Sequence, residues 1–340
     1  MHDKKDAAAA ASLPTTMTAW RQLAYGGPET VVSARIDVPT PGRDEVLLRT
    51  RAVSLNSADV HLMRGEPRMV RLAFGLRRPK RPVLGMDVAG TVVALGEGVA
   101  DWAVGDEVVG ELPGGGLAEY VAAPVKRIVR RPEDLSAETA ATLPLAGGTA
   151  WQALDRAHVG TGDRVLVIGA SGGVGTFAVA LAALRGAEVD ALTGARSRSL
   201  VEGLGATRAF DYRAVGPGSA QLGRGGYDAV IDVVGAARLS ALRALVREGG
   251  AAVLVGSGTE GLFDPLPRLA AASVRSIGSK RPLRPLAAVA DARILSELLD
   301  LAASGALKPA IERTWPLAEA GAALAHVDAG HTLGKVVVTA

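Results

Sequence analysis

The stretch Val165-Leu-Val-Ile-Gly-Ala-Ser-Gly-Gly-Val-Gly175 decides the fold of this chain. Its first four residues form an apolar run that is too short for a helix. A glycine-dense turn follows, and Thr176–Ala183 then continue as an apolar run without helix breakers. This order predicts a buried parallel strand that leads through a turn into the N-terminus of a helix. Because glycine has no Cβ, backbone N–H groups in such a turn can approach a pyrophosphate, and the helix dipole favours its negative charge.

The turn departs from the usual G-x-G-x-x-G spacing, because Ala170 stands where the first glycine would be. Glycines also cluster in plain tight turns, so the surroundings decide between the two interpretations. A strand precedes the turn, a helix follows it, and a second strand, Glu188–Thr193, comes at the expected distance. We therefore interpret the turn as a dinucleotide-binding site rather than a simple β-α-β connection. The turn residues expected to contact the cofactor are Ser171, Gly172, Gly173, Val174 and Gly175.

The end of the second strand indicates which dinucleotide is bound. An NAD site places a carboxylate about 20 residues after the glycines, whereas an NADP site places a cation there. Here the strand ends in Thr193-Gly-Ala-Arg196-Ser-Arg198 without an acid, and Asp190 lies inside the strand. A guanidinium with neighbouring hydroxyl groups suits a phosphate dianion. The sequence therefore predicts NADP(H), with Thr193 and Arg196 as contacts; the alternative is a solvated Arg-Ser loop.

Composition excludes several classes of protein. The 340 residues fit two domains, and 48% hydrophobic residues with 42 glycines are typical of an α/β protein rich in turns. The net charge of +3 comes from arginines scattered along the chain, so no nucleic-acid partner is expected. One local basic cluster, between Arg64 and Arg81, lacks the interleaved aromatic residues of single-strand binders. This cluster is interpreted as part of the solvent-exposed surface or, as the alternative, as a binding site for an anionic substrate.

The chain contains no cysteine, which excludes disulfides, thiolate zinc sites and a cysteine nucleophile. No run approaches the roughly 20 apolar residues of a membrane span, so no membrane association is expected. The N-terminal apolar part, Ala7–Ala11, is too short for a signal peptide. Residues 1–16 are expected to form a disordered tail, and the protein is expected in the cytoplasm.

The chain divides into two parts with different sequence patterns. The first third carries short valine-rich runs bounded by turn residues, which predict a compact, barrel-like antiparallel unit. These runs are Glu45–Val53, Val88–Leu95 and Glu107–Gly110. Six strands that alternate with helices follow and predict a complete Rossmann sheet. They are Val165–Ile168, Glu188–Thr193, Arg208–Tyr212, Asp228–Val233, Ala252–Val255 and Val274–Gly278. A helix, Asp291–Ser304, and a final strand, Lys335–Thr339, complete the expected order.

Seven motifs in sequence order give the chain a family resemblance from about Trp20 to its end. They are Asn56-Ser-Ala-Asp59, Gly85-Met-Asp-Val-Ala-Gly90, Gly105-Asp106, Gly115-Gly-Leu-Ala-Glu-Tyr120, Leu143-Pro-Leu-Ala-Gly-Gly-Thr-Ala150, the glycine turn, and His331-Thr-Leu-Gly-Lys335. The chain resembles the medium-chain dehydrogenase/reductase superfamily, in particular its zinc-independent quinone oxidoreductase branch with the ζ-crystallin-like reductases. The resemblance implies an α/β protein with a GroES-like β-rich catalytic domain, residues 17–141 and 307–340. A Rossmann doubly wound parallel-sheet domain that binds NADP(H), residues 142–306, and a homodimer are implied as well.

The resemblance also implies a site without metal. Zinc-dependent relatives place Cys, His and Cys around a catalytic zinc, and the corresponding positions here are Asn56, Met86 and Gly147. Without a Lewis acid to polarise an alcohol or ketone oxygen, an acceptor that is already electrophilic is favoured. Such an acceptor is a quinone or an alkene conjugated to a carbonyl.

Site roles are implied by the same motifs. Asn56 would donate to a carbonyl oxygen, with capping of the next turn as its alternative role. His61 stands where these enzymes commonly have a tyrosine and would relay a proton, although a lone histidine is often structural. Asp59 is expected to order the loop or to cap the N-terminus of the next helix, with a catalytic role as the alternative. Further cofactor contacts are implied for Thr149, Tyr212, Val234, Gly235, Val255, Gly256, Ser257 and Lys335, the last with a surface lysine as the alternative.

The substrate mouth is expected between Gly258–Leu269 and Pro67–Arg81. The sequence as a whole predicts a zinc-free, NADPH-dependent reductase that transfers hydride to a quinone or to the β-carbon of an α,β-unsaturated carbonyl. One alternative is a metal-free carbonyl reductase or alcohol dehydrogenase. Another, from a different class, is a non-catalytic NADPH-binding protein.

Overall fold

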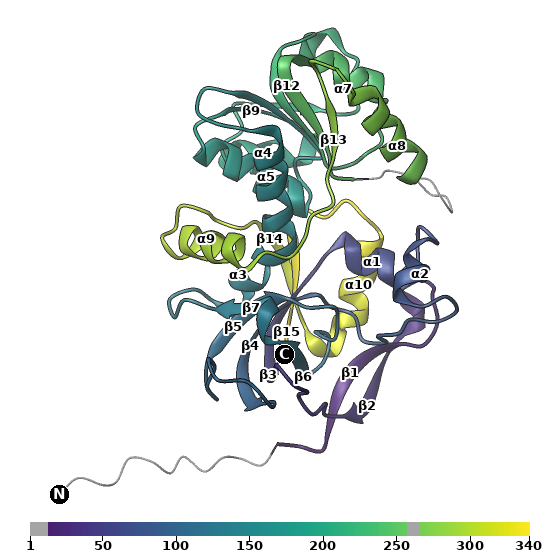
Figure 1. Cartoon of the computed structure of the whole chain (residues 1–340), viewed down its shortest axis with the longest axis vertical. Coiled ribbons are helices and arrows are strands. Elements are labelled where there is room, and N and C mark those ends of the chain that lie inside the picture. The colour runs from purple at the N-terminus through teal and green to yellow at the C-terminus, as the bar shows by residue number, and fades with distance from the viewer. Residues whose placement is uncertain (1–12, 257–264) are drawn as a thin grey trace, which may run out of the picture.

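A computed structural model describes residues 13–256 and 265–340, which form two lobes, each built on its own β-sheet (Figure 1). The lobe at the top of Figure 1 holds a six-stranded sheet and is called the upper lobe. The lobe below it holds a seven-stranded sheet and is called the lower lobe. The last elements of the chain, in yellow, lie with the first ones, in purple and blue, in the lower lobe.

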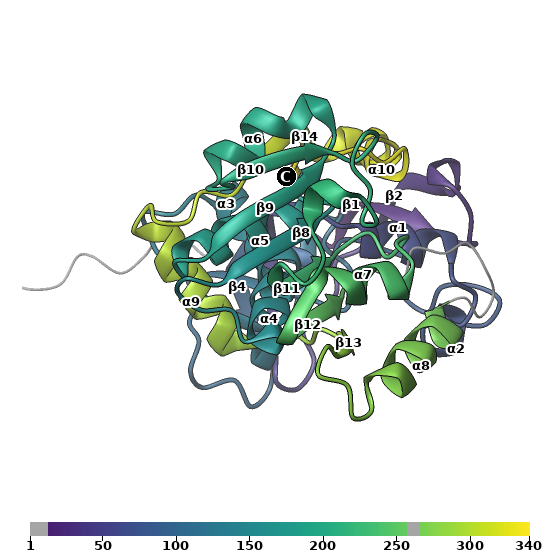
Figure 2. The same cartoon turned by 90° about the horizontal axis from the view of Figure 1, so that it is seen from above.

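The upper sheet has the strand order β10-β9-β8-β11-β12-β13, and all its pairs are parallel (Figure 2). The chain enters in the middle at β8, runs outward to β10 and then crosses to β11, which is the Rossmann order with its switch point between β8 and β11. Its strands are β8 (Arg164–Ile168), β9 (Glu188–Thr193), β10 (Arg208–Asp211), β11 (Tyr227–Asp232), β12 (Val246–Leu254) and β13 (Leu283–Pro285).

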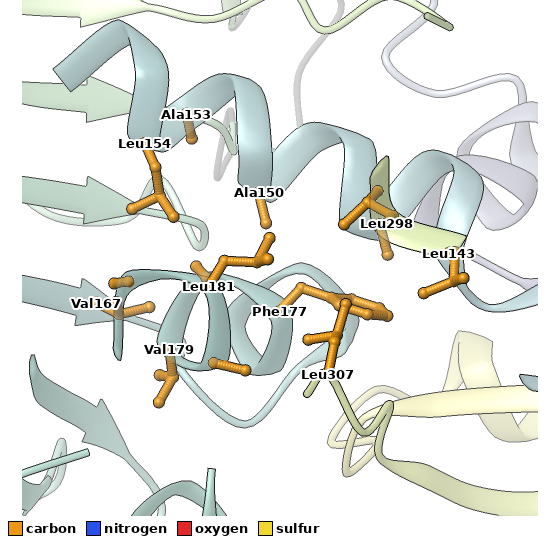
Figure 3. Close-up of a cluster of buried hydrophobic side chains, with 14 of the residues drawn as sticks. Leu143, Ala150, Ala153, Leu154, Val167, Phe177, Val179, Leu181, Leu298 and Leu307 are labelled. Atoms are coloured by element: carbon orange, nitrogen blue, oxygen red, sulfur yellow. The ribbon is translucent and has the colours of Figure 1, made fainter. Parts of the chain in front are cut away.

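Helices cover both faces of this sheet, which explains why the inner parts of its central strands β8, β11 and β12 are continuous apolar runs rather than alternating ones. Val165 and Val167 of β8 pack toward one set of helices, and Leu166 toward the other. The first set is α4 (Gly148–Ala157), α5 (Gly173–Leu184), α6 (Arg198–Gly203) and α9 (Ala292–Ala303). The second is α7 (Leu239–Leu245) and α8 (Pro265–Ser276). In Figure 3, Phe177 of α5 lies among Leu143, Leu298 and Leu307 in the first core.

One predicted strand of the upper lobe is wrong. Val274–Gly278 form the end of α8 and the turn after it, and the sixth strand is β13. The alanines before Val274 favour a helix, and Val274 itself is exposed, unlike a central strand residue. The real strand carries Pro285 and lies at the sheet edge, where a missing N–H is tolerated.

The lower sheet has the order β14-β15-β3-β4-β5-β7, with β6 also paired to β3. Its strands are β3 (Glu45–Leu55), β4 (Asp87–Leu95), β5 (Glu107–Glu111), β6 (Tyr120–Pro124), β7 (Ile128–Arg130), β14 (Ile311–Pro316) and β15 (Lys335–Thr339). Beside it lie the pair β1 (Thr16–Gln22) and β2 (Val31–Asp37), and helices α1 (Ser57–Arg64), α2 (Val70–Phe74), α3 (Ala137–Ala141) and α10 (Ala320–Asp328). The GroES-like β-rich unit and the Rossmann sheet predicted from the sequence are thus both present.

Some expectations fall outside the described ranges. Of the predicted tail, residues 1–16, only the last four are described, and Thr16 already begins β1. The expected cofactor contact Ser257 is not among the described residues, nor is the greater part of Gly258–Leu269. Within the described ranges, no helix has both the length and the apolar character that crossing a membrane requires.

Candidate active site

The glycine turn leaves the N-terminus of α5 free. Gly172 is the N-cap residue, and no side chain of the described residues caps the helix. The backbone N–H groups of Gly173, Val174 and Gly175 have no hydrogen-bond partner among the described residues. A Cβ on Gly175 would lie 2.1 Å from the carbonyl oxygen of Gly169, so only glycine lets the helix approach the turn this closely. Uncapped N–H groups at a helix N-terminus suit an anionic group.

A cleft of about 600 Å³ opens in front of this turn. Five of the predicted contacts line it: Ser171, Gly172, Thr193, Tyr212 and Val234. Thr193 is buried at the end of β9, and its hydroxyl has no partner in the described part of the chain. A buried hydroxyl without a partner costs free energy unless a ligand supplies one. The free backbone N–H groups of the turn and the unpaired Thr193 hydroxyl therefore suit a dinucleotide bound in the cleft.

Two arginines follow the strands that end at the cleft, Arg196 after β9 and Arg213 after β10. Arg196 is exposed in the single turn Ala195–Ser197 directly after β9, but it is not among the residues that line the cleft. The Tyr212 ring lies against Gly194, and the guanidinium of Arg213 lies 5.1 Å from the centre of that ring. The sequence did not single out Arg213.

Asp190 has the interior position that the sequence predicts, because it is fully buried in β9. Its carboxylate accepts hydrogen bonds from Arg164, Arg208 and Tyr227 at 2.6–2.9 Å. Burial raises the pKa of Asp190, although Tyr227 and Arg164 act in the opposite direction. Asp190 is thus committed to the interior of the upper lobe and does not contact the cleft.

The loops after β11 and β12 meet beside the glycine turn. The buried Asp232 organises them, since its carboxylate accepts from Gly235 N at 2.9 Å and from Arg268 at 3.3 Å. The N–H groups of Val255 and Gly256 donate to the Asp232 carbonyl oxygen. The structure thus brings three predicted loop residues together around Asp232, which the sequence analysis did not single out: Gly235 binds its carboxylate, and Val255 and Gly256 bind its backbone carbonyl. The available signal was a single acid at the end of an apolar strand.

A buried charged cluster joins the two halves of the site. Lys335, at the start of β15, is only 2% exposed, and its ammonium donates to Asn56 Oδ1 at 2.5 Å and to the Leu55 carbonyl oxygen at 3.2 Å. Asn56 Nδ2 donates in turn to Asp87 Oδ2 at 2.9 Å. Asp87 Oδ2 lies 3.8 Å from Lys335 Nζ, so the two charges face each other across the amide.

Burial moves both pKa values of this pair toward the neutral forms. It raises the pKa of Asp87 to about 8, although the Lys335 charge opposes the shift. Burial lowers the pKa of Lys335, and the charges of Asp87 and Asp59 oppose that shift. The surface-lysine alternative for Lys335 is wrong, because its side chain is buried.

The other predicted site residues lie around this cluster. Asp59 orders the loop as expected: it is fully buried and accepts from Asn56 N at 2.9 Å and Gly85 N at 3.1 Å. His61 is exposed on α1, and its imidazole has no hydrogen bond to any described residue. Thr149 is buried near the start of α4 and does not line the cleft.

A second, smaller pocket of about 270 Å³ lies in the lower lobe. Its lining includes Leu62, Met86, Phe74, Lys80 and Arg81. The segment Pro67–Arg81, expected at the substrate mouth, therefore borders a pocket that also touches Met86. Apolar walls with a cationic edge suit a small conjugated molecule that carries a polar oxygen.

The residues at this site do not fit a metal ion. Within residues 13–256 and 265–340, no three His, Asp, Glu or Cys side chains come together as possible ligands. A Cβ on Gly147 would lie 3.0 Å from Leu298 and 3.7 Å from Phe177, so a side chain there would enter the core of the upper lobe. Met86 offers only a thioether, which is a poor ligand for zinc.

Two family models match the chain. One, described as "Alcohol dehydrogenase GroES-like domain", covers residues 42–133. The other, described as "Zinc-binding dehydrogenase", covers residues 204–338.

Known proteins match over nearly the whole length. A chloroplast envelope quinone oxidoreductase homolog of Arabidopsis thaliana is 36% identical over 92% of this chain and 95% of its own length. An NADPH-dependent alkenal/one oxidoreductase of the same plant is 30% identical over 96% of this chain and 81% of its own. The solved quinone oxidoreductase of Coxiella burnetii superposes with a TM-score of 0.81 at 28% identity, covering 96% of this chain and 99% of its own.

Proposed function

The chain belongs to the medium-chain dehydrogenase/reductase superfamily and is an NAD(P)H-dependent oxidoreductase. On that premise we propose that it is a zinc-independent reductase that uses NADPH to reduce a quinone or the C=C bond of an α,β-unsaturated carbonyl. The observation that carries the proposal is the site itself. A glycine turn opens on a cleft, and beside it stands a buried lysine–amide–carboxylate cluster; the described residues around it provide no metal-ligand set.

The cofactor would be held by the turn and by the ends of the neighbouring strands. In this proposal the N–H groups of Gly173–Gly175 bind the pyrophosphate, Thr193 donates its unpaired hydroxyl, and Arg196 with Tyr212 faces the 2′-phosphate. When bound, NADPH supplies the hydride. Thr149, the loops at Val234–Gly235 and Val255–Ser257, and the methylene chain of Lys335 complete the proposed contacts.

The acceptor would be polarised by hydrogen bonding alone. A quinone or enone stabilises the negative charge that develops on its oxygen, so it does without the Lewis acid on which unactivated carbonyls depend. Asn56 is the proposed donor near that oxygen, and the exposed His61 is the proposed route by which a proton arrives from solvent. Relatives named for quinone and for alkenal/one substrates support both acceptor classes.

A scan of acceptors tests this function. NADPH oxidation is measured with quinones, enones, enoyl thioesters and saturated aldehydes at equal concentrations. The proposal expects conjugated acceptors to be reduced much faster than aldehydes. Faster aldehyde reduction would favour the metal-free carbonyl reductase, and the absence of turnover with every acceptor would favour a non-catalytic NADPH-binding protein. A small-molecule substrate, a homodimer and a cytoplasmic location remain part of the proposal.

Replacing Arg196 by alanine is expected to weaken NADPH binding and leave NADH binding unchanged. One hydrogen bond to a charged group contributes about 1.5–3 kcal/mol, which corresponds to a roughly ten- to hundredfold higher Kd. Fluorescence titration of both cofactors measures the effect. Arg293→Ala, at an exposed position on α9, is the matched control. Equal affinity of the native protein for NADPH and NADH would contradict the NADPH assignment.

Removal of metal is expected to leave activity unchanged. Residues 13–256 and 265–340 contain no metal-ligand set, so prolonged dialysis against EDTA should not change kcat with a quinone or an enone. Elemental analysis of the purified protein should show no stoichiometric zinc. Activity that is lost on dialysis and restored by zinc would contradict the zinc-independent assignment.

A further inference from the structure

Lys335 touches both halves of the proposed site. Gly334 N donates to the Ser171 carbonyl oxygen at 2.8 Å, and Gly334 forms a bridge with Gly172, so the start of β15 is tied to the glycine turn. A Cβ on Gly173 would lie 3.2 Å from Lys335 Cδ, which places the methylene chain directly against the turn. The ammonium at the end of that chain reaches Asn56 in the lower lobe.

The amide of Asn56 is held from two sides. Its oxygen accepts from Lys335, and its nitrogen donates to Asp87 at 2.9 Å and to the Ser54 carbonyl oxygen at the longer distance of 3.3 Å. Asp87 is fixed in turn, because its other oxygen accepts from Leu145 N at 3.2 Å. The amide hydrogen that points to Ser54 forms the longer of these two hydrogen bonds. It is therefore the hydrogen that the carbonyl oxygen of a substrate can take over. A cation on Oδ1 polarises the amide and strengthens that donor.

We propose that Lys335 is a positioning residue for acceptor reduction, a role that rests on the proposed function. Its ammonium fixes and polarises the Asn56 carboxamide and brings positive charge to the lobe interface, where the part of the chain that the structure describes offers no metal-ligand set. Because the same side chain borders the glycine turn, an anionic cofactor bound there favours the protonated lysine. Lys335 thus couples an occupied cofactor cleft to a competent acceptor site.

The charges that face this lysine come from several elements. Asp87 belongs to β4 and Asp59 to α1, and both favour the protonated lysine. Glu111 of β5 acts on Asp87 and, like Asp59, raises its pKa. An anion at the turn adds a further negative charge. The proton affinity of the Lys335–Asp87 pair is therefore expected to rise when NADPH binds.

The test uses a double variant that leaves no buried charge unpaired. Lys335→Met alone would leave the buried Asp87 carboxylate without its counter-charge, and the variant can fail to fold for that reason. Lys335→Met combined with Asp87→Asn removes both charges and keeps similar volumes. The control is Lys308→Met, at an exposed lysine before β14.

With a quinone and an enone, the double variant is expected to lose about ten- to a hundredfold in kcat, while KM changes less than threefold. Adding Asn56→Ala to it should cause little further loss, because Lys335 acts through that amide. Asn56→Ala alone should lose about as much as the double variant. Two results would overturn the proposal. One is a triple variant whose loss in kcat is the product of the losses in Asn56→Ala and in the double variant; the other is a double variant with native kcat.

A binding measurement is independent of turnover. Calorimetric titration with NADPH at pH 8, in buffers of different ionisation enthalpy, is expected to show net proton uptake in the native protein and less in the folded double variant. Equal uptake in both would overturn the coupling even if the enzyme is active. If uptake differs as expected but no acceptor is reduced, the proposed function fails and the link between cofactor and lysine stands.

Discussion

Gly175→Ala is expected to abolish NADPH binding and to destabilise the protein. The new methyl group would lie 2.1 Å from the Gly169 carbonyl oxygen and 2.8 Å from the backbone carbons of Ala170. Backbone atoms cannot move aside as a flexible side chain can, so α5 must shift away from the turn. That shift opens the core around Phe177 and separates the uncapped N–H groups from the cleft. We expect a loss of about 3 kcal/mol in the free energy of unfolding.

Thermal unfolding and NADPH titration of the same variant measure both effects. Gly203→Ala in α6 is the matched control, because a Cβ there meets nothing within 4 Å. The control should be neutral or slightly stabilising, since alanine favours a helix more than glycine does. A Gly175→Ala protein with native Tm and native NADPH affinity would show that the close approach of α5 to the turn is not required.

Asp190→Ala is expected to cost about 2–4 kcal/mol in the free energy of unfolding without contacting the cofactor. The carboxylate is fully buried and is the hydrogen-bond acceptor for the Tyr227 hydroxyl at 2.7 Å. Its removal leaves that buried hydroxyl without an acceptor and leaves Arg164 and Arg208 without their counter-charge. Both arginines are partly exposed and can turn toward water, which limits the loss.

Denaturant unfolding of Asp190→Ala beside Asp300→Ala provides the comparison. Asp300 is exposed on α9, and its replacement should change stability by less than about 0.5 kcal/mol. The NADPH Kd of the folded Asp190→Ala protein should stay close to native. A large increase in that Kd would mean that Asp190 takes part in the cofactor site after all.

The sequence predicts the fold well where the signal is local. The run into Val165–Gly175 places a strand, a turn and a helix next to one another, and such neighbours are visible in a window of about 20 residues. The prediction fails at Val274–Gly278, where apolar residues belong to a helix whose exposed side is also apolar. The true edge strand has only three residues and contains Pro285, so its pattern is too short to recognise.

Sequence patterns indicate only some of the residues that meet at the candidate site. The glycine turn and the end of β9 are recognisable in the sequence by their composition and spacing. Lys335, Asn56 and Asp87 come from β15, the loop after β3, and β4, and nothing in their spacing indicates that they meet. Their hydrogen bonds form because β15 pairs with β3 and β3 with β4, which is a property of the folded sheet.

The most direct test of the central claim is the product formed from an α,β-unsaturated aldehyde. Such a molecule offers the enzyme both a conjugated C=C bond and a C=O bond, so one experiment compares the two chemistries at equal concentration. With NADPH labelled by deuterium at the transferable position, the products are identified by NMR. The proposed function predicts the saturated aldehyde with deuterium on the β-carbon. The unsaturated alcohol with deuterium on the carbonyl carbon would contradict it.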